Sequence, residues 1–500
     1  MNLFRTKSVE AFLEDLEKGP QLKRALGPLA LISLGLGAII GAGIFVITGH
    51  AAASYAGPAV AISFIISGIA CALAGLAYAE FAAMVPVAGS AYTYAYATLG
   101  EFWAWFIAWN LVLEYMIAGA TVAVGWSGYV VDLFKQFGIH LPSYLTSAPI
   151  DILTSEEKEK LIESGYSLSF LEKYLNLHFT GSYINLPAVL VILMVGLILL
   201  IGISESAFVN NIIVIVKATV LILFVILGFG KIDFSNWDPF IPPSTDKFGE
   251  FGWSGILRAA GVVFFAYIGF DAVSTAAQEA KNPQKDVPIG ILGSLFISTL
   301  LYVAVSLVMT GVVHYSQLNV AAPIAVAVNA MGPQFAWLML VVKIGAIAGL
   351  TSVILMTLLG QTRIFFAMAR DGLLPDFFSK VHPKFKTPYI STIVVTLGAM
   401  LIAAIFPIGL LGELVSIGTL LAFSIVCIAV VILRIKRPDI NRPFKMPFAF
   451  VIAPLGALGC ILQMVFLPLD TWIRLAIWTI IGITIYFAYG YRHSKLNKPE

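Results

Sequence analysis

The chain has 500 residues, of which 59% are apolar and 12% are charged, and its formal net charge is +2. Soluble domains usually hold about 45–50% apolar and about 25% charged residues, so lipid is the expected solvent for most of this chain. The near-neutral charge gives no electrostatic case for nucleic-acid binding, and the scattered cysteines and histidines form no metal-binding motif.

Apolar runs recur along almost the whole chain. A membrane-spanning helix needs about 20 mostly apolar residues. By that rule we predict an all-α integral membrane protein of twelve transmembrane helices. The predicted spans are 28–49, 58–84, 102–131, 184–203, 208–230, 254–278, 288–313, 333–362, 388–406, 410–434, 448–467 and 471–491.

Two polar stretches lie outside these spans. Residues 1–27 are predicted to form a cytoplasmic segment, with an amphipathic surface helix over Ser8–Leu26 or, alternatively, a flexible tail. Residues 135–181 mix acidic and basic side chains with a helical apolar period, which predicts a small extracellular helical cap. We refer to residues 135–181 as the insert.

The distribution of basic residues predicts the orientation. With the N-terminus inside, the cytoplasmic segments hold about 20 Lys and Arg residues and the outer loops about seven, as the positive-inside rule requires. An even number of spans then places the C-terminal tail, residues 492–500, in the cytoplasm as well. The expected location is the cytoplasmic membrane of a cell.

The first and sixth spans contain helix-weakening residues at mid-membrane. Gly35, Gly37, Gly41 and Gly43 interrupt the first, and Gly269 lies near a carboxylate in the sixth. Broken helices persist at this depth only where they line a cavity, so a ligand site is expected there. GxxxG helix packing stays open as an alternative, but a dinucleotide fingerprint fails because position 40 is isoleucine.

The breaks fall at corresponding places if the chain is a repeat of five helices plus five. Paired interruptions of this kind indicate a transporter binding site. The predicted organisation is therefore a first repeat over 28–230, a second over 254–434, and two appended helices over 448–491.

Three ionisable residues lie deep in predicted spans, where each costs roughly 2.5–3.5 kcal/mol. Glu114 lies roughly 18 Å and Lys217 roughly 14 Å along their helices at 1.5 Å per residue. Asp271 has a similar depth in the sixth span. Because burial disfavours the charged forms of acids and amines, a cluster of the three could bind and release a proton. A static ion pair is the alternative.

Four segments in this order resemble the amino acid, polyamine and organocation superfamily, especially the cationic amino acid transporters and their bacterial relatives. They are GAIIGAGIF over 37–45, FFAYIGFDAVST over 264–275, KNPQ over 281–284 and RIFFAMARDG over 363–372. The resemblance implies a leucine-transporter-like fold with the substrate between spans one, three, six and eight.

The resemblance also implies roles for individual residues. The substrate carboxylate would meet backbone amides of Ile40, Gly41, Ala42 and Gly43, because half-helix N-termini favour anions. Its ammonium group would meet carbonyls of Ile39, Phe265, Ala266 and Ile268. Gln278 departs from the acidic residue common in relatives, which puts one cytoplasmic gate contact in doubt.

The same resemblance implies proton coupling. Lys217 matches a lysine that replaces bound sodium in proton-coupled relatives, so no sodium site is expected. Its ammonium would hold the break in span one when charged and release it when neutral. Glu114 and Asp271 match positions linked less specifically to proton movement.

In the eighth span, a bulky Ile354 or Leu355 facing the pocket would exclude a long cationic side chain. The sequence therefore predicts proton symport of L-amino acids, small neutral ones such as alanine, across a lipid bilayer. Amino acid exchange and transport of cationic amino acids by uniport or symport stay open, as does an accessory membrane subunit. A nutrient receptor, an enzyme and an ion channel are disfavoured, and no cofactor or metal is expected.

Overall fold

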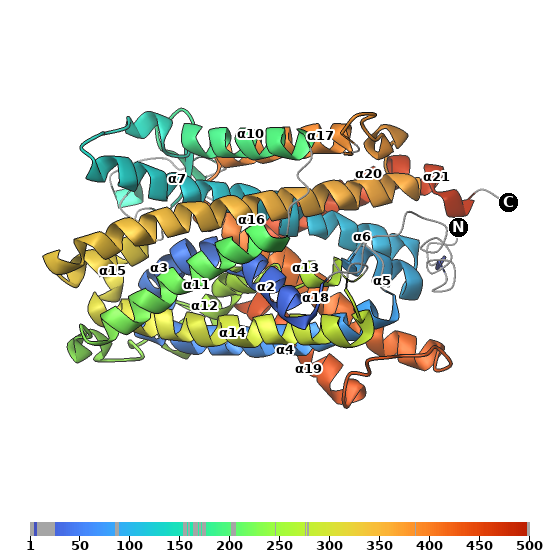
Figure 1. Ribbon diagram of the computed structural model, residues 1–500, viewed down its shortest axis with the longest axis horizontal. Helices are drawn as coiled ribbons and strands as arrows, with labels where there is room; N and C mark the ends of the chain where they lie inside the picture. The colour runs from blue at the N-terminus through green and yellow to red at the C-terminus, as the bar shows by residue number, and fades with distance from the viewer. Residues whose placement is uncertain are drawn as a thin grey trace.

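The computed structural model is a bundle of long helices that run along its longest axis (Figure 1). We call the end at which both termini lie the terminal end, and the opposite end, where the chain leaves α7 (Ala118–Gln136), the insert end. The described residues are 5–7, 26–85, 90–153, 158, 161–163, 169, 172, 177–201, 207–245, 247–275, 277, 280–385 and 387–497.

The length and apolar composition of the helices identify this bundle as membrane-embedded. Within the described part of the chain, nine helical runs are long and apolar enough to cross a membrane, and three shorter apolar helices accompany them. Large apolar side chains such as Leu190, Leu397 and Leu458 are exposed on the outside of the bundle. Such a surface is stable in lipid but would be costly in water, so the chain is a multi-pass membrane protein.

The first half of the chain begins and ends its helices close to the predicted boundaries. Labels beginning with η denote short 3-10 or π helices. The elements are α2 (Pro28–Ile39), η1 (Gly43–Ile47), α3 (Thr48–Ala51), η2 (Ala52–Ala56), η3 (Gly57–Ala59), α4 (Val60–Met84), α5 (Ser90–Thr98), α6 (Glu101–Val112), η4 (Leu113–Ile117), α7 (Ala118–Gln136), η5 (Ser143–Leu145), β1 (Ile150–Ile152), β2 (Leu177–Phe179), α10 (Leu186–Ile201) and α11 (Ala207–Phe229).

The second half is also almost entirely helical. Its elements are η6 (Phe234–Trp237), α12 (Gly252–Val263), η7 (Phe264–Tyr267), α13 (Ala272–Thr275), α14 (Pro283–Val312), η9 (Tyr315–Gln317), α15 (Pro323–Ala330), η10 (Pro333–Phe335), α16 (Ala336–Arg370), η11 (Asp376–Ser379), α17 (Tyr389–Ile405), α18 (Ile408–Lys436), α19 (Ala449–Phe466), α20 (Leu469–Ile485), η12 (Tyr486–Gly490), α21 (Tyr491–His493) and η13 (Lys495–Asn497).

Several helices extend beyond the predicted spans, as α16 and α14 illustrate. The eighth span was expected to end at residue 362, but α16 continues to Arg370. The seventh was expected to begin at residue 288, but α14 begins at Pro283, with Pro288 still near its N-terminus. Pro283 is the first residue of α14, where proline is tolerated because the backbone amide has no intrahelical partner, whereas Pro288 lies inside the helix. The added turns of both helices contain charged residues, so they lie outside the apolar runs from which the spans were predicted.

The helices pack in an order that brings the two halves of the chain together. α4 packs along α14, α7 along α16, and α10 along α17. α10 and α17 lie side by side at the upper edge of Figure 1, away from the first and sixth spans. The interior of the bundle therefore lies between helices from both halves.

The insert contains a structure that the sequence did not predict. β1 and β2 form an antiparallel pair in which Ile150 is opposite Phe179. The middle of the segment predicted to be a helical cap, between residues 154 and 176, lies largely outside the described residues. Ser8–Ala25 of the predicted N-terminal helix and Gln278 also lie outside them. The prediction for these segments therefore stays a prediction.

Candidate functional site

Both predicted helix breaks are confirmed, and they lie against each other. α2 ends at Ile39, and Ile40 adopts an extended conformation with ψ 96° before η1 begins at Gly43. In the sixth span η7 ends at Tyr267, and Ile268 is extended with ψ 135°. η1 and η7 are in contact.

Two glycines make this close approach possible. A Cβ added to Gly43 would lie 2.2 Å from the Cα of Ala266, so any side chain there would force the two breaks apart. Gly269 has φ +112°, a conformation that other residues rarely adopt, and it approaches Ala38. The glycines are therefore required at the breaks and do not serve helix packing alone.

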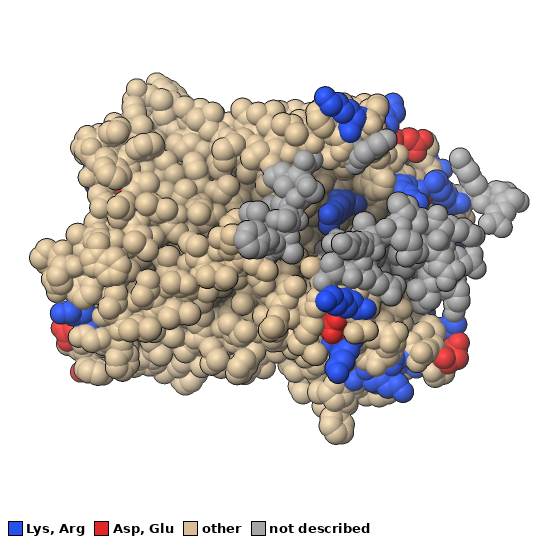
Figure 2. Space-filling view, in the orientation of Figure 1, with Lys and Arg blue, Asp and Glu red and all other residues tan. Residues whose placement is uncertain are grey.

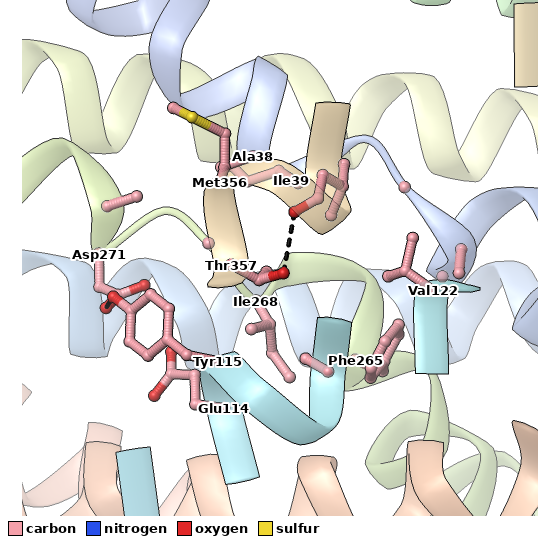
Figure 3. A pocket seen from close by; sticks show the side chains of 17 residues that line it. Ala38, Ile39, Glu114, Tyr115, Val122, Phe265, Ile268, Asp271, Met356 and Thr357 are labelled. Atoms are coloured by element: carbon pink, nitrogen blue, oxygen red, sulfur yellow. Dashed lines mark hydrogen bonds between the residues drawn. The ribbon is translucent and has the colours of Figure 1, made fainter. Parts of the chain in front are cut away.

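A buried cavity lies between the two breaks and the third and eighth spans, and we call it the central cavity (Figure 3). The centres of water molecules could occupy about 30 Å³ of it, so it is small in this conformation. Eight predicted site residues line it, namely Ile39, Gly41, Ala42, Gly43, Glu114, Phe265, Ile268 and Asp271. Gly269, which had marked the break in the sixth span, also lines it. The lining residues that sequence reasoning missed are Ala38, Tyr115, Ala118, Val122, Ala272, Val353, Met356 and Thr357.

The predicted face of the eighth span requires correction. Ile354 and Leu355 were expected at the cavity, but neither is among its lining residues. Val353, Met356 and Thr357 line it instead. Each residue of a helix is rotated by about 100° from the last, so an error of one position moves a side chain off the cavity face.

The break in the first span is held by a lysine from the fifth. The side chain of Lys217 is fully buried, and its Nζ donates to the carbonyl oxygens of Gly37 at 2.7 Å and Ile40 at 3.0 Å. The aliphatic stem packs so closely on α16 that a Cβ at Gly349 would overlap it. Helix-end carbonyls have no intrahelical donor, and Lys217 provides one.

The expected cluster of three charges is therefore only partly correct. Lys217 bonds to backbone carbonyls, and among the described residues no ion pair joins it to Glu114 or Asp271. Carbonyl dipoles take the place of a carboxylate because the break frees them beside the lysine. Lys217 contacts the site from behind the first span and does not line the cavity.

The two acids do come together. Glu114 and Asp271 are buried neighbours that interact electrostatically, and both line the central cavity near Tyr115 (Figure 3). The Tyr115 hydroxyl donates to Oδ2 of Asp271 at 2.5 Å. The central cavity is therefore lined on one side by two carboxyl groups that lie side by side.

A tyrosine from the seventh span touches both breaks at once. The hydroxyl of Tyr302 lies 2.9 Å from the carbonyl oxygen of Ile39 and 2.9 Å from that of Ala266. Both carbonyls had been assigned to the site from the sequence, but Tyr302 had not. Its helix carries no local signal of this role, because the two partners lie far away in the sequence.

The two ends of the bundle differ in how they are closed. At the insert end a wide polar vestibule is lined by side chains that include His50, Tyr55, Arg258 and Glu413. At the terminal end polar contacts cross the bundle. Asp371 accepts a hydrogen bond from Tyr92 at 2.6 Å and pairs with Lys7 at 3.5 Å, and Glu101 accepts bonds from Tyr486 and Ser494.

Comparison with known proteins adds independent information. The profile of a family described as amino acid permease matches residues 26–486. The chain is 44% identical to the methylthioribose transporter of Bacillus subtilis (strain 168), over 99% of this chain and 100% of the relative. It is 44% identical to the branched-chain amino acid permease BcaP of the same organism, over 99% of each chain. It is 38% identical to cationic amino acid transporter 4, vacuolar, of Arabidopsis thaliana, over 88% of this chain and 68% of the relative.

Proposed function

Because this chain belongs to the amino acid permease family, within the superfamily that its motifs resemble, we propose that it imports L-amino acids by proton symport. It is a membrane transporter and not an enzyme. The observation that carries the proposal is the meeting of two broken helices at a buried cavity, with a buried lysine bonded to one of the breaks.

The breaks offer complementary partners for both charges of an α-amino acid. The helix that begins near Gly43 presents the amides of Gly41 to Gly43 to a carboxylate. The predicted role of the Ile40 amide is less well supported, because this amide already donates to the carbonyl oxygen of Leu36 at 3.0 Å. Carbonyls of Ile39, Phe265, Ala266 and Ile268 are placed to accept hydrogen bonds from an ammonium group. The positive end of a half-helix and freed carbonyls together favour a zwitterion over either ion alone.

The rest of the cavity favours an uncharged side chain. Val122, Val353 and Met356 are apolar, and Glu114 already interacts with Asp271. A guanidinium or ammonium group on the side chain of the substrate would lose its hydration there without gaining a dedicated partner, which is costly. We therefore propose small neutral amino acids such as alanine as substrates.

Proton coupling is assigned to Lys217 with the acid pair. When charged, Lys217 holds the first span to the fifth through the carbonyls of Gly37 and Ile40. A neutral lysine donates more weakly, so the inner half of the first span is free to move and to open the terminal end. Glu114 and Asp271 provide a second proton site that faces the substrate. No sodium ion is needed in this scheme.

We further propose twelve spans in an inverted repeat of five plus five, followed by two helices. The packed pairs α4 with α14, α7 with α16 and α10 with α17 are those that the repeat makes equivalent. Both termini are assigned to the cytoplasm. On the face drawn in Figure 2, Lys and Arg gather at the terminal end and few lie at the insert end, as the positive-inside rule expects.

Uptake by purified protein in liposomes tests this proposal. Labelled alanine should accumulate faster and to a higher level with an inward proton gradient than without one, and protein-free liposomes give the background. Equal uptake with and without the gradient would contradict proton symport. Transport that occurs only with amino acid on both sides would favour exchange, and arginine uptake above alanine uptake would overturn the assigned substrate class.

A further inference from the structure

Tyr302 lies where the two broken spans meet. It belongs to α14 and is fully buried, and its hydroxyl is 2.9 Å from the carbonyl oxygens of both Ile39 and Ala266. One of these carbonyls ends the first half of span one, and the other belongs to the break in span six. A single side chain thus ties together two backbone segments that form opposite sides of the site.

Aromatic packing fixes the position of this hydroxyl. The ring of Tyr302 lies 5.4 Å from that of Phe64 and 5.5 Å from that of Tyr267, measured between centroids. Tyr267 is itself anchored through its hydroxyl, which donates to the carbonyl of Phe64 at 2.8 Å. Rings held on two sides have little freedom, so the hydroxyl is preorganised between the two carbonyls.

The number of hydrogens matters at this contact. A tyrosine hydroxyl has one hydrogen, so it can donate fully to Ile39 or to Ala266, or share the hydrogen between them, but it cannot give each carbonyl a full hydrogen bond. The pair therefore keeps one acceptor whose hydrogen bond must come from elsewhere. An ammonium group carries three donors and a positive charge, which suits two acceptor oxygens held close together.

Tyr302 differs in this respect from Lys217, which bonds to the carbonyls of Gly37 and Ile40. Lysine can lose its charge in a coupling step, whereas a tyrosine hydroxyl stays a neutral donor near neutral pH. The two side chains hold different carbonyls from different helices. Tyr302 can consequently keep the acceptor pair in place while Lys217 changes state.

We infer that Tyr302 is a positioning residue whose hydroxyl holds the Ile39 and Ala266 carbonyls as a preformed acceptor pair for the ammonium group of the substrate. This inference rests on the proposed function, because it requires a substrate with a free α-ammonium group. Without the hydroxyl, two carbonyl dipoles face each other with no shared donor, so they should separate and bind the ammonium group less well.

Ligand binding to Tyr302→Phe tests the inference, with Tyr129→Phe as the matched control. Tyr129 is also a buried tyrosine that donates to a carbonyl of the first span, that of Phe45 at 2.8 Å, but Phe45, unlike Ile39, does not line the central cavity. Each variant keeps its ring and loses one buried hydroxyl. Thermal unfolding of the ligand-free variants should therefore show similar small decreases in both.

Two ligands separate positioning from general damage. The first is the L-amino acid that most stabilises the wild-type protein in a thermal-shift screen, and the second is its 2-hydroxy acid, which lacks the ammonium group. Tyr302→Phe should raise the Kd of the amino acid about tenfold and that of the hydroxy acid less than about threefold, since one hydrogen bond to a charged group is at stake. Tyr129→Phe should change neither by more than about twofold.

Several outcomes would overturn the inference. Equal losses for both ligands would show that Tyr302 supports the site only generally. An unchanged or lower Kd of the amino acid would show that the hydroxyl is irrelevant to the ammonium group or competes with it. If no amino acid stabilises the wild-type protein, the proposed function itself is wrong. That outcome is distinguishable from failure of the inference about Tyr302, because it is seen in the wild-type protein before any residue is substituted.

Discussion

Two buried charges in this protein are held in opposite ways. Glu80 in α4 accepts hydrogen bonds from Arg434 at 3.0 and 2.5 Å and from the backbone amide of Met446 at 2.8 Å, and Arg442 lies 3.4 Å away. Lys217 is equally buried but bonds only to the backbone carbonyls of Gly37 and Ile40, within the described part of the chain.

The difference shows how to separate structural from functional charges in a membrane interior. Glu80 is surrounded by full positive charges, so removing its charge leaves arginines buried without a counter-ion. Among the described residues, Lys217 bonds only to groups with partial charges, so its neutral form leaves none of them as an unpaired opposite charge. A charge of the first kind holds helices together, whereas the proposed function assigns proton exchange to a charge of the second kind.

The largest expected loss of stability comes from Glu80→Gln. The substitution keeps the size of the side chain but removes the charge between Arg434 and Arg442, which should cost about 3–5 kcal/mol. Thermal unfolding in detergent measures the effect, and Asp439→Asn is the control because the Arg437–Asp439 pair is exposed. A Glu80→Gln protein as stable as the control would erase the distinction drawn between the two buried charges.

Lys217→Met should abolish coupling while leaving a folded protein. Methionine fills the same space without a charge, so the carbonyls of Gly37 and Ile40 lose their donor and gradient-driven uptake should fall to the level without a gradient. Lys343→Met is the matched control, because Lys343 is also buried but pairs with Asp132 at 2.9 Å. Uptake by the control should still respond to the gradient. An equal response in both variants would remove Lys217 from the mechanism.

Glu114→Gln should have a smaller effect on the same measurement. Glutamine keeps hydrogen-bonding groups beside Asp271 but cannot exchange a proton, so gradient-driven uptake should fall about tenfold, equivalent to ~1.4 kcal/mol. The Kd of the substrate should change by less than about threefold. Retention of full gradient-driven uptake would show that the acid pair takes no part in proton movement.

The smallest effect concerns an ion pair outside the membrane. Nδ1 of His178 lies 2.9 Å from Glu172 in the insert, and this hydrogen bond, with further bonds from Ser169, lowers the pKa of Glu172 to about 2. A lowered carboxylate pKa contributes stability above the unfolded value of about 4.3, and the contribution is lost as the pH falls toward 2.

Pepsin cleavage can measure this contribution, because the protease is active across that range. Cleavage within the insert should increase between pH 4.5 and pH 2.5 in the wild-type protein. His178→Ala should already be cleaved faster at pH 4.5 and should respond less to further acid. Identical pH profiles for the two proteins would mean that the pair does not stabilise the insert.

The sequence predicted the breaks because their cause is local. Gly43 and Gly269 mark positions where any side chain would clash, and glycine within an apolar span is a readable signal. The depths of Glu114 and Asp271 were likewise set by helix rise along one span. Predicting these features requires no information about residues that are distant in the sequence.

Contacts between distant segments could not be predicted in the same way. The partners of Lys217 are carbonyls about 180 positions away, and every residue has a carbonyl, so the sequence carries no sign of the choice. Tyr302 was missed for the same reason. The residues from Val353 to Met356 in α16 are all apolar, so periodicity could not separate Ile354 from Met356 at the cavity. α5 was missed because its nine residues are too few for a membrane span, which was the criterion used to predict helices.

Substrate-driven proton movement tests the central claim most directly. Wild-type protein and Lys217→Met are placed in liposomes that contain a trapped pH indicator, with equal pH on both sides, and substrate is added outside. The account predicts internal acidification with wild-type protein and none with Lys217→Met, although both bind the substrate. Substrate entry into wild-type liposomes without acidification, or equal acidification with both proteins, would contradict it.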